Sequence, residues 1–208
     1  MDIKALQVGY IGTNCYILAD EETRICALVD PGGDADQIET AVQMCGYTPC
    51  AVFLTHGHDD HVGAVSVMQQ LWPEIPVYLN QRDVYPQEDR EIQKLFPHVD
   101  GKIVSYDEGD QIAVGGLTVS VLATPGHSEG SVTLLCGDAM FCGDTLFPGS
   151  CGRTDFVGGS TEKILASLKR LGRLEGNYRV LPGHGSPTEL DRERKKNPYL
   201  YHALNQMG

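Results

Sequence analysis

The chain has 208 residues, of which 41% are hydrophobic, and a formal net charge of −12. Such a chain can bury a core of its own, so we expect one domain over residues 1–208. The acidic charge disfavours nucleic acid as a partner, because phosphate backbones are bound by basic surfaces. A late basic cluster, at Arg192, Arg194, Lys195 and Lys196, is expected on the solvent face of a C-terminal helix.

The first residues do not join a basic start to an apolar stretch, and no window reaches the ~20 apolar residues of a membrane span. The seven cysteines form no Cys-x-x-Cys pair, and most lie in apolar, strand-like runs. We therefore expect a cytoplasmic protein without a membrane partner and without a thiolate zinc site. Cys142 and Cys151 are interpreted as buried or structural thiols rather than redox-active ones.

In the first half, apolar runs bounded by turn residues predict strands near residues 3–8, 14–19, 25–30 and 51–55. Helical spacing predicts a helix over residues 35–45, with Asp34 as N-cap and Gly46 as C-terminal stop. A second helix is predicted over residues 61–72, ended by Pro73.

The polar segment 81–97 is expected to be helical or irregular. The second half shows the same pattern of apolar runs, which predict strands near residues 111–114, 117–123, 132–136, 139–143 and 178–181. Helices are predicted over 161–171 and in the tail, 197–205. Two strand-rich halves, each followed by helices, favour a four-layer α/β sandwich of two stacked sheets with helices outside.

Four potential metal ligands crowd one turn directly after an apolar strand. Residues 55–63 read Thr-His-Gly-His-Asp-Asp-His-Val-Gly and contain His56, His58, Asp60 and His61. A loop can aim His56 and His58 at one ion, while Asp60 and His61 open the next helix and point elsewhere. One tetrahedral ion could not easily use all four.

Three further potential ligands, His127, Asp144 and His184, each follow a predicted strand and a glycine. Ligands gather at strand ends in layered α/β folds. A single histidine at a strand end is usually a surface or capping residue. Here five of the seven histidines fall in these motifs, and only His98 and His202 are left as surface residues. The sequence therefore predicts a metal site.

The order His-x-His-x-Asp-His, then a lone His, an Asp and a final His, resembles the metallo-β-lactamase superfamily over nearly the whole chain. The resemblance implies a four-layer αββα sandwich with two mixed sheets and helices on the outer faces. It also implies two divalent ions, most simply Zn²⁺, with Fe or Mn left open because imidazole and carboxylate accept all three. The implied ligands are His56, His58 and His127 for the first ion, Asp60, His61 and His184 for the second, and Asp144 as bridge.

Asp60 and Asp144 are expected to act in catalysis as well as in metal binding. Asp30, in Val-Asp-Pro-Gly-Gly, matches a family position that supports the site from behind, although it could simply begin a Pro-Gly turn. Asp59 is interpreted as a cap of the helix that follows. Two ions sharing a water would present hydroxide to a carbonyl carbon, and activity should fall in acid as the histidines protonate.

The segments Gly143–Phe147 and Ser150–Arg153 resemble glyoxalase II, the hydroxyacylglutathione hydrolases. This implies hydrolysis of an acyl thioester, with Arg153 holding a substrate carboxylate. The alternative for Arg153 is a surface pair with Asp155. Thr154 and Asp155 stand where that branch has aromatic residues, and no segment matches its C-terminal helical domain. We therefore assign the chain to a compact glyoxalase II-like group. Another small ester or a lactone remains possible as the substrate.

Two rival interpretations remain. A persulfide dioxygenase-like enzyme would use one iron on the first ligand set, and a metal-dependent interaction module would have no activity. Asp144 argues against β-lactamases with Cys at that place, and His58 argues against flavodiiron relatives. We expect a small-molecule substrate, and the sequence does not indicate an oligomeric state.

Overall fold

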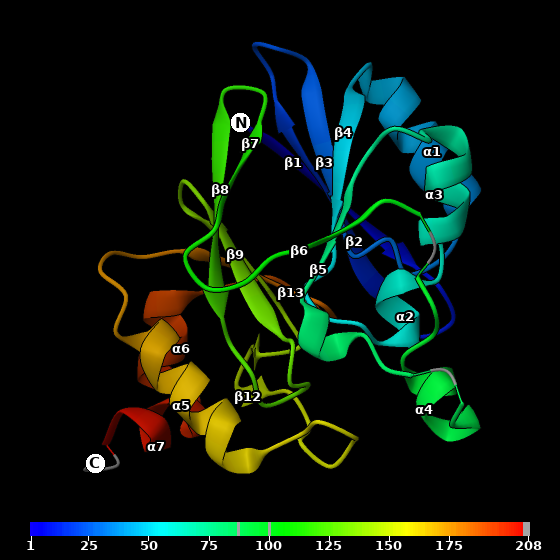
Figure 1. Cartoon of the computed structure of the whole chain (residues 1–208). Helices are drawn as coiled ribbons and strands as arrows, with labels where there is room; N and C mark the ends of the chain where they lie inside the picture. Colours follow the sequence, from blue (N-terminus) through cyan, green and yellow to red (C-terminus); the bar gives the residue numbers. More distant parts are fainter. Residues whose placement is uncertain (87, 100, 206–208) are drawn as a thin grey trace.

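The computed structural model describes residues 1–86, 88–99 and 101–205, in which two six-stranded sheets lie face to face (Figure 1). The first sheet follows chain order: β1 (Asp2–Val8), β2 (Thr13–Asp20), β3 (Ile25–Val29), β4 (Thr48–Phe53), β5 (Val77–Leu79) and β6 (Ile103–Ser105). The second has the order β14 (Thr188–Glu189), β13 (Arg179–Pro182), β10 (Ala139–Gly143), β9 (Val132–Cys136), β8 (Leu117–Ala123) and β7 (Gln111–Val114). A separate hairpin joins β11 (Leu146–Phe147) to β12 (Ser150–Cys151).

Both sheets are mixed, as the resemblance implies. In the first, β1 to β3 pair antiparallel, and β3 to β6 pair parallel. In the second, β7 to β10 pair antiparallel, β10 and β13 pair parallel, and β14 closes the edge antiparallel. Strands β3, β4, β8, β10 and β13 consequently end where the site is built.

Helices cover both outer faces and complete the four predicted layers (Figure 1). On the first sheet lie α1 (Ala35–Cys45) and α3 (Val65–Leu71), and on the second lie α5 (Thr161–Gly172), α6 (Leu190–Lys196) and α7 (Pro198–Asn205). Three buried apolar clusters fill the three interfaces between these layers. Each fully buried large apolar side chain contributes roughly 1.5–3 kcal/mol, so the layers are held chiefly by burial.

Strand β2 shows how the sequence specifies this layering. All eight of its residues are buried. Successive side chains of a strand point to opposite faces. Accordingly Cys15 and Ile17 pack into the helix-covered cluster, whereas Tyr16 and Leu18 pack between the sheets. A continuous apolar run is what a strand buried on both faces requires.

The predicted helix over residues 61–72 is wrong in its bounds. The chain forms a short α2 (Asp59–Val62), turns, and resumes as α3. The turn arises because the backbone N–H of Ala64 donates to the carbonyl of Pro31, 2.9 Å away, instead of continuing the helix. The backbones approach so closely that a Cβ on Gly32 would lie 1.6 Å from the carbonyl oxygen of Asp60.

The capping prediction for Asp34 is confirmed, and that for Asp59 is wrong. Asp34 occupies the N-cap position of α1, but it has a φ of 48° and makes no side-chain cap bond. Its carboxylate instead accepts from the N–H of Gly9 at 2.9 Å. Asp59 lies inside the first turn of α2 and accepts from the hydroxyl of Tyr10 at 2.9 Å, while His58 occupies the N-cap position.

The late basic cluster lies on α6, as predicted for a C-terminal helix, and Arg192, Lys195 and Lys196 are exposed. Arg194 differs, because its partly buried guanidinium donates to the carbonyl oxygens of Gly172, the last residue of α5, and of Gly176. The predicted tail helix begins at Pro198, after a short break.

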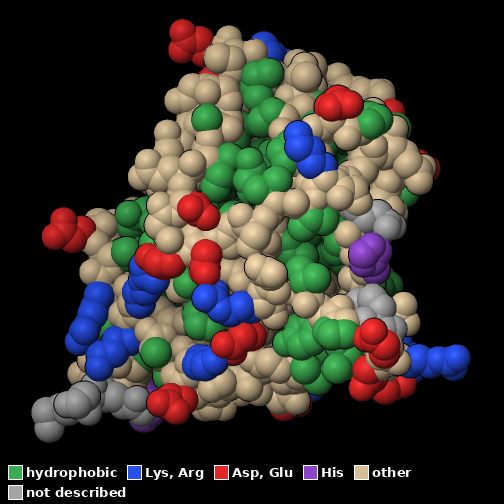
Figure 2. Space-filling model, in the orientation of Figure 1, with side chains coloured by type: hydrophobic (Ala, Val, Ile, Leu, Met, Phe, Trp, Pro, Cys, Tyr) green, Lys and Arg blue, Asp and Glu red, His purple; other side chains and the backbone are tan. Residues whose placement is uncertain are grey.

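On the face seen in Figure 2, basic side chains lie among acidic ones and form no continuous basic surface among the described residues. Among the described residues, Arg170 forms an ion pair with Glu108 and Lys163 forms one with Glu129, both at 2.6 Å. Within the described ranges, none of the helices combines the length and apolar character needed to cross a membrane.

Gly32→Ala should lower the free energy of unfolding by about 3 kcal/mol, because the added methyl group meets rigid backbone rather than a movable side chain. Urea denaturation followed by circular dichroism measures this. Gly176→Ala is the control, since its Cβ would meet no atom within 4 Å and only its φ of 82° opposes the change, at about 1 kcal/mol. Equal losses in the two variants would contradict the close-contact explanation.

Candidate metal centre

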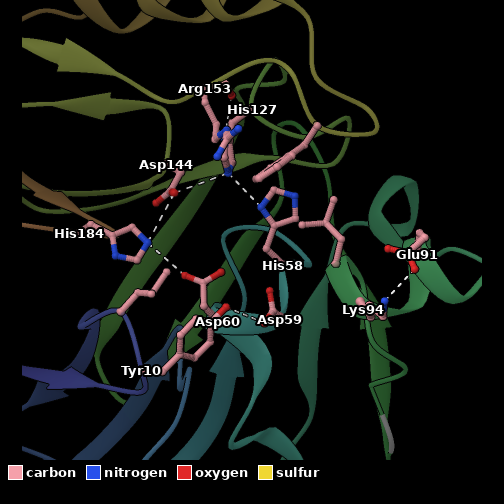
Figure 3. A pocket seen from close by; sticks show the side chains of 13 residues that line it. Tyr10, His58, Asp59, Asp60, Glu91, Lys94, His127, Asp144, Arg153 and His184 are labelled. Carbon is pink, nitrogen blue, oxygen red and sulfur yellow. Dashed lines mark hydrogen bonds and ion pairs between the residues drawn. The ribbon is translucent and has the colours of Figure 1, made fainter.

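The candidate ligands all follow strands whose carboxyl ends meet at one edge of the stacked sheets. His56 and His58 follow β4, with Asp60 and His61 in α2, while His127 follows β8, Asp144 follows β10 and His184 follows β13. Strands β8 and β10 each run antiparallel to β9, and β13 runs parallel to β10, so these three point the same way. The structure thus brings all seven predicted ligands together, and Figure 3 shows five of them around one pocket.

The donor atoms form adjoining groups within which all atoms lie within 4.8 Å of one another: His56, His58 and His127; His56, His61 and Asp144; and Asp60, His61 and His184. The first and third are the two sets that the resemblance implies. Asp144 lies between them, with its Oδ2 3.5 Å from His127 Nε2 and 3.6 Å from His184 Nε2. Its Oδ1 is 3.5 Å from His61 Nε2.

These residues fit divalent cations. Buried atoms that lack a hydrogen-bond partner among the described residues include His56 Nε2, His61 Nε2 and Asp144 Oδ1. Leaving such atoms unpaired costs about 1–3 kcal/mol each, so native proteins seldom do so without a ligand. In addition, His58 Nδ1 and His127 Nε2 lie 3.0 Å apart, two ring nitrogens aimed at one place. Imidazole and carboxylate donors suit zinc, iron and manganese alike.

Burial and neighbouring charges favour the neutral form of His58 and the ionised form of Asp60, which are the forms that bind cations. Burial lowers the pKa of His58 to about 3, and the neighbouring His127 adds to the shift. Burial also opposes ionisation of Asp60, but the hydrogen bond from His184 and the charge of His61 bring its pKa below the usual range. Neutral imidazole and ionised carboxylate are the ligand forms that metals require.

For His61 the balance is reversed. Burial by itself lowers the pKa of this imidazole, but the carboxylates of Asp30 and Asp144 raise it well above the usual value. Asp30 Oδ2 lies 3.0 Å from His61 Nδ1, which turns Nε2 towards the other ligands. The same carboxylate accepts from the N–H and the hydroxyl of Thr55, both at 2.7 Å. Asp30 therefore lies behind the site, where the sequence analysis places it.

Several residues that fix the ligands carry no signal in the sequence. The hydroxyl of Thr13 donates to Asp60 Oδ2 at 3.0 Å. The N–H of Asn14 donates to the carbonyl of Gly183 at 2.7 Å, next to His184. Both residues begin β2, about 170 positions from His184, so only the packing of one sheet on the other reveals their role.

Glycines before the ligands are required by contacts at the site. A Cβ on Gly183 would lie 2.2 Å from Asp144 Oδ1, and one on Gly143 would lie 2.2 Å from the hydroxyl of Thr55. Both positions therefore need a residue without a Cβ.

Residues 126–130 read Gly-His-Ser-Glu-Gly and so have the Gly-x-Ser-x-Gly spacing of a hydrolase nucleophile elbow. The structure excludes Ser128 from that role. Its side chain is fully buried, and its hydroxyl donates to the carboxylate of Asp83 at 2.7 Å. A nucleophile elbow needs an exposed hydroxyl.

A pocket of about 570 Å³ opens over the ligands and is lined also by Tyr10, Ile11, Lys94 and Phe156 (Figure 3). Arg153 lines it too, but its guanidinium pairs with both carboxylate oxygens of Asp155, at 2.7 and 2.6 Å. It also lies 3.8 Å above the ring of Phe156. The structure thus shows the surface pair that the sequence analysis leaves open, at the rim of the predicted substrate site.

The remaining sequence expectations concern residues outside the centre. His98 and His202 are exposed, as predicted. All seven cysteines are free. Burial raises the pKa of Cys142 to about 12 and also raises that of Cys151, which opposes the thiolate form that redox chemistry needs.

Comparison with known proteins agrees with this geometry. The metallo-beta-lactamase superfamily profile matches residues 8–184. A Bacillus subtilis protein named probable metallo-hydrolase YqgX is 37% identical over 96% of this chain and 98% of its own length. A Yersinia pestis hydroxyacylglutathione hydrolase is 34% identical over 88% of this chain, which spans 64% of that relative.

Solved structures show the same architecture. TTHA1623, determined in a di-iron-bound form, superposes with a TM-score of 0.81 at 34% identity, over 94% of this chain and 99% of that one. The B3 metallo-beta-lactamase BLEG-1 gives a TM-score of 0.83 at 33% identity, over 96% and 99%. With its sheets, its helices and the converging histidines and aspartates on the same plan, the chain belongs to the metallo-β-lactamase superfamily.

Proposed function

We propose that this protein is a dinuclear metallo-hydrolase that cleaves small acyl thioesters, hydroxyacylglutathiones among them. The observation that carries the proposal is the convergence of seven donor groups into two adjoining sets with Asp144 between them, below an open pocket. The relatives named probable metallo-hydrolase and hydroxyacylglutathione hydrolase support this class of reaction. A small-molecule substrate and a cytoplasmic location, without nucleic acid or membrane as partner, belong to the same proposal.

Each residue has a stated task. Bound divalent cations supply Lewis acidity and a water whose pKa is near neutral. His56, His58 and His127 hold one cation, Asp60, His61 and His184 hold the other, and the two oxygens of Asp144 face both groups. Zinc is our first choice, and the di-iron form of TTHA1623 makes iron the main competitor.

The side chains around these ligands orient them and exclude water. Asp60 and Asp144 line the pocket, where their carboxylates are placed to contact a reacting water as well as metal. The ring of Phe96 lies 4.6 Å from that of His58, and Phe156 lies 5.8 Å from it, so this imidazole is shielded from solvent. No serine or cysteine nucleophile is required.

The second ligand set distinguishes the proposal from its rivals. A persulfide dioxygenase-like enzyme with a single iron needs only the three-histidine group, and leaves Asp60, His61 and His184 without a task. An interaction module needs no open pocket above its metal. The likeness to a β-lactamase places lactams beside esters in the substrate panel.

Metal depletion should abolish hydrolysis of S-lactoylglutathione or a related thioester, because the chain would then lack its means of activating water. The experiment measures metals per chain by elemental analysis and thioester cleavage before and after chelation, in the absence of oxygen. Re-addition of zinc or iron should restore turnover. One iron per chain with oxygen consumption would favour the dioxygenase, and failure across thioesters, esters and lactams would refute the hydrolase.

His56→Ala and Asp144→Ala should each lower kcat about 10³-fold or more, because each removes a side chain that we expect to contribute several kcal/mol of transition-state stabilisation. Steady-state kinetics measures this, with circular dichroism to show that the variants fold. His202→Ala is the control, because that histidine is exposed on α7. Retention of full turnover by either variant would point to a different catalytic centre.

Arg153→Met should raise KM for a glutathione thioester about tenfold and leave kcat nearly unchanged, because a lost ion pair of ~1.4 kcal/mol affects binding alone. Asp155→Asn should lower KM for the same thioester, because Asp155 competes with the substrate for the guanidinium of Arg153. Kinetics with an uncharged thioester provides the control, for which neither variant should matter. Unchanged KM in both variants would remove Arg153 from substrate binding.

A further inference from the structure

Asp83 is a buried carboxylate that neither the family motif nor the proposed chemistry uses. Its side chain is 3% exposed and ends a short 3₁₀ helix, η1 (Gln81–Asp83), which follows β5. Asn80 fixes this helix, because its side-chain oxygen accepts from the N–H of Arg82 at 3.0 Å. Its amide donates to the carbonyl of Tyr106 at 3.1 Å. The side chain of Asn80 therefore helps to fix the position of Asp83 at the site edge of the first sheet.

The carboxylate accepts three hydrogen bonds from two different loops. Oδ2 accepts from the N–H of Gly57 at 2.9 Å and from the hydroxyl of Ser128 at 2.7 Å. Oδ1 accepts from the N–H of Gly130 at 2.6 Å. Gly57 lies between His56 and His58 in the first sheet's loop, whereas Ser128 and Gly130 follow His127 after β8 of the second sheet. One side chain thus connects the segments that carry all three histidines of one group.

The two loops are shaped to receive this carboxylate. A Cβ on Gly57 would lie 3.0 Å from Asp83 Cβ, and a Cβ on Gly130 would lie 2.7 Å from Asp83 Cγ. Neither glycine has a positive φ, so backbone conformation does not explain why these two positions are glycines. Close packing against Asp83 explains it, because a Cβ would collide with that side chain.

We propose that Asp83 is a positioning residue that sets the spacing of the His56–His58–His127 group by tying its two loops together. The inference rests on the proposed two-metal site and gives the three-histidine group a support in Asp83, in addition to Asp30, which holds His61 and Thr55. None of the three bonds that Asp83 accepts comes from Asp60, His61 or His184, so its influence on the second group is indirect. A carboxylate suits the position because it offers acceptors on both oxygens, whereas an Asn would turn an N–H towards one of the donors.

The test is titration of the metal-depleted full chain with Co²⁺, followed by visible absorption in competition with a chelator. The His184→Ala variant lacks a ligand of the second group. The Co²⁺ affinity that remains in this variant is therefore that of the three-histidine group. Asp83→Asn should weaken that affinity about 10- to 100-fold, as is typical for residues that hold metal ligands in place. The affinity of the second group should change by less than about threefold.

Asp20→Asn is the matched control. Asp20 is 7% exposed, and its carboxylate also accepts from three donors, Glu22 N, Thr23 Oγ1 and Gly116 N. It ends β2 at the edge opposite to the site, because β2 runs antiparallel to β3. Both Asn variants should lower the urea midpoint, but only Asp83→Asn should lower metal affinity.

Ser128→Ala provides a second variant that keeps Asp83 and both backbone bonds. It should weaken the same affinity in the same direction by a smaller factor, which supports the inference even if Asp83→Asn does not fold. Unchanged affinity in these variants, or equal weakening at both groups, would overturn the role of Asp83 while leaving the hydrolase proposal intact. A wild-type chain that binds no cobalt would overturn both.

Discussion

Bringing five imidazoles and two carboxylates together away from water is the constraint on which the rest of this structure depends. Buried ionisable groups lose hydration, and the loss is tolerable only when each finds a partner of fitting charge or geometry. Nε2 of His56 and Oδ1 of Asp144 lack a hydrogen-bond partner among the described residues. The cluster is therefore consistent with a scaffold whose last partners are cations.

The scaffold meets this constraint by assigning the ligands to strand ends and fixing each loop from behind. Asp30 holds His61 and Thr55, the N–H of Asn14 holds the His184 turn, and Asp83 joins the two histidine loops. The contacts of Asn14 with Gly183 and of Asp83 with Gly130 cross from one sheet to the other, so the apolar layer between the sheets also sets distances within the site. Packing and chemistry are coupled because the interior is close-packed and does not yield easily.

The rim of the pocket is built from other segments than the strands that precede the candidate ligands. The walls of the pocket come from loops and from α4 (Arg90–Leu95), which carries Lys94, rather than from the strands that hold the ligands. Tyr10 and Ile11 are exposed on this rim, and the hydroxyl of Tyr10 donates to Asp59 in α2. The same superfamily architecture serves proteins named as a hydroxyacylglutathione hydrolase and as a β-lactamase.

The candidate ligands and the layers could both be predicted from the amino-acid sequence. The His-x-His-x-Asp-His segment is local, and strands such as β2 and helices such as α1 and α5 follow from apolar periodicity. Strands of two or three residues, such as β6 and β11, could not be predicted from the sequence, because so short a run shows no hydrophobic periodicity. Only the tertiary structure decided the break between α2 and α3, the partner of Asp34 and the connecting role of Asp83. Each depends on a backbone group brought near by residues distant in the chain, and neither spacing nor composition records such an approach.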